Sequence, residues 1–311
     1  MISTKTSNVL RGIAILMVIG SHYAGWMYTE SFNESLRNWI STWGVYGVDI
    51  FFVLSGYGLV KSADRNGIDK RFVIRRILNS YVPYILIIGF FSILDKSVDS
   101  KEALIKLVTG YDFWYMFVLF AMYIMFMVIY KIGWFKEILL TIGVIAFTYL
   151  LYIKEFADFW ELSNGAFLIG VYAATLEKKF GERIKELIIK SNLTMISFAV
   201  MIVCAFWHVF SGSMSAHMTA SMLFSVMTVG FAVQFTSGGF ILPVLGRYSL
   251  YIYLLHTRLF WKFVAYKEEW SYLRGSVTAA LITLLISVAL GFCIEYWLGR
   301  FEKKVVVKKE S

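Results

Sequence analysis

The chain is a near-continuous succession of apolar runs, each about as long as a membrane is thick, with short polar breaks between them. A bilayer core is about 30 Å thick, so a spanning helix needs roughly 20 mostly apolar residues. Hydrophobic residues make up 59% of the 311 positions and charged residues only 16%, which leaves too few polar side chains to cover a soluble domain. We expect an all-α polytopic membrane protein, folded as a single domain over 1–311 without a fused extracytoplasmic domain.

The apolar runs predict ten membrane-spanning helices. Their expected ranges are 8–28, 40–60, 72–94, 113–131, 134–153, 160–176, 190–210, 216–236, 240–265 and 276–300. Cytoplasmic loops carry an excess of Lys and Arg, and more than two thirds of these residues fall on the side of the two termini. Both termini are therefore expected in the cytoplasm.

The formal net charge of +9 is explained by the same loops. Basic loops next to anionic lipid headgroups are common in membrane proteins, so the charge predicts a bilayer as partner and no nucleic acid. The two cysteines, Cys204 and Cys293, both lie inside predicted spans. Their positions indicate neither a metal site nor a disulfide framework.

The first predicted span, "VLRGIAILMVIGSH", contains two ionisable residues, Arg11 and His22. At about 100° per residue, eleven residues bring both side chains to one face of a helix, about 16 Å apart along its axis. In a purely structural interpretation, the Arg11 side chain snorkels to the lipid headgroups, and His22 donates a hydrogen bond to a neighbouring backbone carbonyl. Ionisable residues inside a membrane are costly and commonly functional, so both residues are candidates for a site.

The second span, "WGVYGVDIFFVLSGYGL", contains four glycines and one acid. Gly44, Gly47, Gly56 and Gly58 are typical of close helix packing. Asp49 has two interpretations that the sequence leaves open. It either caps the outer end of the helix, or it orients a histidine or contacts substrate.

Two further stretches place polar residues at membrane depth or at its edge. In "DKRFVIRRILNSYVPY", Arg75 and Arg76 stand where a helix enters the membrane, which suits either charge anchoring or a phosphate site, because guanidinium groups bind phosphate bidentately. In "GRYSLYIYLLHTRLF", Ser249 and His256 are seven residues apart and share a helix face.

Together these stretches resemble the type-3 membrane acyltransferase family over nearly the whole chain. The motifs that carry the resemblance are the Arg11–His22 spacing, "GVDIFFVLSGY" with Ser55 and Tyr57, "FWYMFVLFAMY" with Trp114 and Tyr115, "LGRYSLYIYLLH" with Ser249 and His256, and "IEYW" before the basic tail. Two departures concern Asn79, which stands where the family often has a third arginine, and Tyr296, where the family usually has a proline after the glutamate.

The resemblance implies transfer of an acyl group, most simply acetyl, from cytosolic acyl-CoA to a hydroxyl of a cell-surface or lipid-linked glycan. His22 would be the general base, with Asp49 or Ser55 orienting it, and Arg11, Arg75 and Arg76 would bind the donor phosphates. The donor is a co-substrate, and no tightly bound cofactor is expected. A bacterial cytoplasmic membrane is the implied location, and homo-oligomer formation stays open.

Two alternatives accompany this interpretation. A covalent acyl-histidine relay would use His22 as a nucleophile instead of a base. A transporter or flippase for a glycan or lipid-linked intermediate would use the same polar residues to line a path. The absence of a visible inverted repeat in the sequence makes the transporter less favoured.

Overall fold

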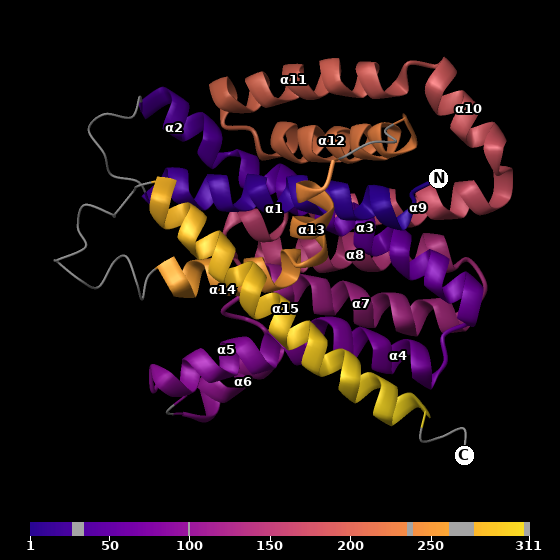
Figure 1. Ribbon diagram of the computed structural model, residues 1–311. Helices are drawn as coiled ribbons and strands as arrows, with labels where there is room; N and C mark the ends of the chain where they lie inside the picture. The colour runs from indigo at the N-terminus through magenta and orange to yellow at the C-terminus, as the bar shows by residue number, and fades with distance from the viewer. Residues whose placement is uncertain (27–33, 99, 235–238, 261–276, 308–311) are drawn as a thin grey trace.

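The computed structural model describes residues 1–26, 34–98, 100–234, 239–260 and 277–307, and all regular elements in these ranges are helices (Figure 1). In chain order they are α1 (Thr4–Trp26), α2 (Glu34–Ser41), α3 (Trp43–Asn66), α4 (Lys70–Arg76), the π-helical turn η1 (Ile77–Tyr81), α5 (Val82–Leu94), α6 (Lys101–Thr109), α7 (Trp114–Ile132), α8 (Lys136–Ile153), the 3-10 turn η2 (Asp158–Trp160), α9 (Asn164–Phe180), α10 (Glu182–Lys190), α11 (Leu193–Ser211), α12 (Met214–Gln234), α13 (Ile241–Arg247), α14 (Ser249–Phe260) and α15 (Val277–Val307). The predicted all-α class is confirmed.

Six helical segments of the described chain are long and apolar enough to cross a membrane, which confirms a polytopic membrane protein. They are Leu36–Asn66, Lys70–Leu94, Trp114–Ile132, Lys136–Ile153, Met214–Gln234 and Leu281–Arg300. A seventh is added if α10 and the following helix through His208, bent by 55°, form one span.

The predicted number of ten spans is not confirmed. Helix α1 is not among the six spans, and α9 has only 17 residues, fewer than the roughly 20 that a bilayer requires. The expected span over 240–265 is divided at Tyr248, whose backbone leaves the helical region between α13 and α14. Its last residues, 261–265, lie outside the described part.

Helices α1 and α13 touch backbone to backbone. A Cβ atom on Gly12 would lie 2.2 Å from the carbonyl oxygen of Leu242, and one on Gly246 would lie 1.7 Å from the carbonyl oxygen of Asn8. Membrane helices depend on such close approach, because lipid offers no hydrophobic driving force for association between them. The two glycines therefore determine how closely α13, and the helix that follows it, lie against α1.

The central helix α3 packs in the same way against α9 and α1. A Cβ on Gly56 would meet the carbonyl oxygen of Phe167 at 2.2 Å, and Gly170 of α9 lies equally close to Val53. Gly44 and Gly47 face α1, so the predicted packing role is confirmed for three of the four glycines. For Gly58 it is wrong, because a Cβ atom there would have no neighbouring atom within 4 Å.

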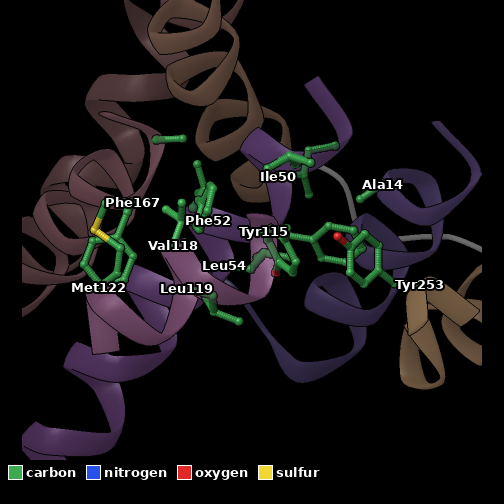
Figure 2. Packing of buried hydrophobic residues seen from close by; sticks show 14 of the residues in the cluster. Ala14, Ile50, Phe52, Leu54, Tyr115, Val118, Leu119, Met122, Phe167 and Tyr253 are labelled. Atoms are coloured by element: carbon green, nitrogen blue, oxygen red, sulfur yellow. The ribbon is translucent and has the colours of Figure 1, made fainter. Parts of the chain in front are cut away.

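Aromatic and aliphatic side chains fill the space between α3, α7, α9 and α14 (Figure 2). Phe52, Met122 and Phe167 are completely buried, and Tyr115 and Tyr253 lie ring to ring at one end of this cluster. Helices α8 and α11 instead expose large apolar side chains such as Ile142 and Phe206, as expected for surfaces that face lipid.

The glycine contacts predict that Gly56→Ala destabilises the protein while Gly58→Ala does not. The added methyl at position 56 overlaps a backbone carbonyl, so we expect a loss of about 1–3 kcal/mol, typical of overpacking. Thermal unfolding of the two variants in the same detergent measures the difference. Position 58 lies on the same helix two residues away, and equal melting temperatures for both variants would contradict the packing argument.

Candidate functional site

A cavity of about 700 Å³ lies between α1, α3, η1, α7, α13, α14 and α15. Its wall contains four arginines, Arg11, Arg76, Arg247 and Arg300, and one carboxylate, Glu295. Because these cations come from four different helices, the tertiary fold assembles them into one electropositive chamber. Such a chamber suits a ligand with several negative charges.

The arginines in this wall differ in their existing partners. Arg247 forms a bidentate pair with Glu295, with nitrogen–oxygen distances of 3.0 and 3.2 Å. The guanidinium of Arg76 lies 5.1 Å from the ring centre of Phe72, and its buried Nε has no hydrogen-bond partner in the described part of the chain. An unsatisfied buried donor is unusual, and an anion in the cavity would satisfy it.

The π-helical turn η1 forms another part of the cavity wall. Pro83 follows it and has no backbone N–H, so the carbonyl of Asn79 lacks its normal partner four residues on, and the helix widens for one turn. Leu78, Asn79 and Ser80 line the cavity as a result. Turns of this kind occur often at functional sites, and this one places Asn79 in the chamber.

Two tyrosines of the cavity wall contact each other, Tyr115 of α7 and Tyr253 of α14. Their rings are 5.1 Å apart and nearly perpendicular (Figure 2). The hydroxyl-bearing Ser55 and Ser249 also line the cavity. Tyr253 in turn lies 5.9 Å from the ring of His256, so this tyrosine connects the wall of the arginine-lined chamber to the histidines.

His22 and His256 form a hydrogen-bonded pair next to Tyr253. The distance from His22 Nδ1 to His256 Nε2 is 2.7 Å. The two rings are within 6° of parallel, with centres 5.0 Å apart. His256 is only 1% exposed, whereas His22 is partly exposed. The sequence placed these residues 234 positions apart and indicated no contact between them.

Asp49 forms a buried contact with α12. Its side chain is fully buried, and Oδ1 accepts a hydrogen bond of 2.7 Å from Ser221 on α12. The same serine hydroxyl is 3.0 Å from the carbonyl oxygen of Leu162. Asp49 therefore connects α3 to α12 through Ser221. A role in orienting a histidine or contacting substrate stays a prediction.

Three other predicted residues also lie outside the cavity wall. The hydroxyl of Tyr57 donates to Glu177 on α9 and accepts from the backbone N–H of Ile2. Trp114 packs against Phe159 with ring centres 5.4 Å apart. Arg75 is exposed and does not line the cavity, in contrast to its neighbour Arg76.

The structure therefore brings Arg11, Arg76, Ser55, Tyr115 and Ser249 into one cavity wall and pairs His22 with His256. Sequence reasoning missed Arg247 and Arg300 as cavity residues, because loop and tail cations at the positive-inside face carry no distinguishing signal. In the described ranges, no three His, Cys, Asp or Glu side chains are grouped as metal ligands.

One known family model covers nearly the whole chain. Residues 5–296 match the acyltransferase domain of the acyltransferase 3 family. The chain belongs to the acyltransferase 3 family. No curated protein and no solved structure matches it. The protein is therefore a membrane acyltransferase, and family membership implies an acyl donor.

The contacts of Asp49 predict that Asp49→Asn keeps most of the acyltransferase activity. The amide oxygen can still accept from Ser221, so we expect a rate within about threefold of wild type, whereas removal of a group that orients a catalytic histidine costs 10-fold or far more. Transfer rates of the two purified proteins measure this. A drop in rate of more than about 100-fold in folded Asp49→Asn would instead show that Asp49 takes part in catalysis.

Proposed function

We propose that this acyltransferase moves an acetyl group from cytosolic acetyl-CoA to a hydroxyl of a cell-surface or lipid-linked glycan, with His22 as general base. The observation that carries the proposal is the His22–His256 pair, which lies next to Tyr253, a residue of the arginine-lined cavity wall. The cavity supplies a place for a polyanionic donor, and the histidine supplies a proton acceptor at neutral pH.

The volume and charge of the cavity support a polyanionic donor such as an acyl-CoA. Pockets for small ligands commonly measure about 300–1,000 Å³, and this one measures about 700 Å³. Arg11 and Arg76 would bind donor phosphates through charge-assisted hydrogen bonds, with Arg247 and Arg300 added to the set that the sequence suggested. The donor is a co-substrate that arrives and leaves.

The cavity includes Asn8 near the start of α1 and Arg300 near the end of α15. Both lie on the side of the bundle where α1 begins and α15 ends (Figure 1). We place this side in the cytoplasm of a bacterial cell, because most Lys and Arg of the loops are there. The thioester arm of the donor would then extend past Tyr115 and Tyr253 towards His22.

At His22 the transfer needs one proton acceptor and no metal ligand from this chain. The base removes the proton of the glycan hydroxyl as the oxygen attacks the thioester carbonyl carbon. The carbon–sulfur bond then breaks, and the departing sulfur takes the proton back from the imidazole. Proton transfer of this kind contributes typically 10²–10⁴-fold to a rate.

The base assignment predicts that His22→Ala abolishes transfer without preventing donor binding. We expect a rate at least about 100-fold below wild type, measured as transfer of labelled acetyl from acetyl-CoA to glycan in membranes or reconstituted vesicles. Donor binding to the purified variant, followed by calorimetry, is the control for folding. Wild-type transfer rates in a folded His22→Ala protein would refute the proposal, and a transporter would move glycan without acetyl-CoA.

Arg75 and Arg76 are neighbours in the chain, but only Arg76 lines the cavity. The two residues therefore form a matched pair for substitution. Losing a hydrogen bond to a charged group costs about 1.5–3 kcal/mol, so Arg76→Ala should raise the KM for acetyl-CoA about 10-fold or more. Arg75→Ala removes the same charge outside the cavity and should change KM by less than about twofold. Steady-state kinetics with varied acetyl-CoA measure both. Equal effects of the two substitutions would argue against donor binding in this cavity.

A further inference from the structure

We propose that His256 is a positioning residue that holds His22 in the tautomer with its proton on Nδ1, so that Nε2 is the atom that accepts the substrate proton. This inference rests on the proposed function for the role of the base. The tautomer itself follows from the hydrogen bonds of the pair and from the burial of His256.

At the buried end of the pair, His256 contacts the backbone of α14. His256 Nδ1 lies 2.7 Å from the carbonyl oxygen of Tyr253 and 3.1 Å from that of Ile252, one turn earlier on α14. A carbonyl oxygen can only accept a hydrogen bond, so Nδ1 of His256 must carry a proton and donate it. An unprotonated Nδ1 would place its lone pair against two oxygens.

The protonation of the other nitrogen follows from charge. His256 is 1% exposed within an apolar helix bundle, where a charged imidazolium would lose its hydration. The neutral ring carries a single proton, and this proton is on Nδ1. Nε2 of His256 therefore presents a lone pair to Nδ1 of His22, 2.7 Å away.

His22 must then donate. A short contact between two ring nitrogens is favourable only if one of them carries the hydrogen, and His256 Nε2 does not. Nδ1 of His22 carries it, and the neutral His22 ring therefore has its own lone pair on Nε2. Nε2 is consequently the atom of His22 that can act as a base.

The ring geometry supports a directed hydrogen bond and not stacking. The 5.0 Å between ring centres equals the 2.7 Å between nitrogens plus one ring radius on either side. Both nitrogens must therefore lie close to the line that joins the two centres, so that the N–H of His22 points along the plane of its ring at the lone pair of His256.

The same arrangement serves the reaction before and after proton transfer. When Nε2 of His22 takes the hydroxyl proton, the ring becomes an imidazolium, and its Nδ1–H still donates to His256 without any reorientation. The lone pair of His256 then faces the new positive charge. A neutral partner suits this position, because a permanently charged carboxylate among apolar helices would be costly to bury.

The direct test is histidine nitrogen NMR on the whole protein. We would label all histidines with ¹⁵N and ¹³C in lipid-reconstituted wild-type protein and assign His22 and His256 by comparison with His22→Gln and His256→Gln. The expected spectrum shows protonated Nδ1 and unprotonated Nε2 in both rings. A His22 ring protonated at Nε2 would overturn the proposal, whatever the enzymatic activity of the sample.

The functional test compares two substitutions at position 256. The Gln side chain in His256→Gln can place an oxygen near the former Nε2 and accept from His22, so we expect kcat within about fivefold of wild type. His256→Leu has similar bulk and no acceptor, and we expect its kcat to fall about 100-fold with the KM for acetyl-CoA unchanged, in the range seen when a histidine loses its orienting partner. His208→Gln, at a histidine outside the pair, is the control and should leave kcat unchanged.

The outcomes separate the two proposals. Equal losses in His256→Gln and His256→Leu would overturn the positioning role, because they would show that the ring is needed for something other than its acceptor atom. If wild-type protein transfers no acetyl group at all, the proposed function fails, while the NMR spectrum still decides the tautomer of His22.

Discussion

Backbone contact between α1 and α13 is the interaction on which the candidate site depends. Gly12 and Gly246 remove the side chains that would hold these helices apart, and each glycine precedes one of the paired histidines by ten residues. The separation of the helices at the glycines therefore limits the separation of His22 and His256 further along. A larger residue at either glycine would move a backbone and not merely a side chain.

The residues proposed to bind the charged donor are separate from those proposed to transfer the proton. In the proposed mechanism, a polyanionic donor binds in the chamber with four arginines, where guanidinium groups from several helices would share its charge. The proposed proton acceptor, His22, lies beside the buried His256 and outside the wall of this chamber. This separation is physically useful, because a cation directly beside a histidine would disfavour its protonated form.

Much of the fold could be predicted from the sequence, because the bilayer permits few alternatives. Every backbone polar group in lipid needs an internal partner, so apolar runs of this length become helices. The break at Tyr248 and the π-helical turn before Pro83 were not predicted, because both depend on local backbone geometry within apolar sequence. The positions of Asp49 and Arg75 outside the cavity wall could not be predicted either, since composition cannot distinguish a cavity wall from its surroundings.

The sequence by itself determined the membrane class and the helical content. It identified the ionisable residues inside apolar runs, which are costly in a membrane and commonly functional. It also placed Arg11 and His22 on one helix face, since helical periodicity is a local property. Only the tertiary structure decided that His22 meets His256 and that Arg76 enters a cavity while Arg75 does not. These outcomes depend on the crossing of helices far apart in the chain, which is set by side-chain volume at their contacts and not by local pattern.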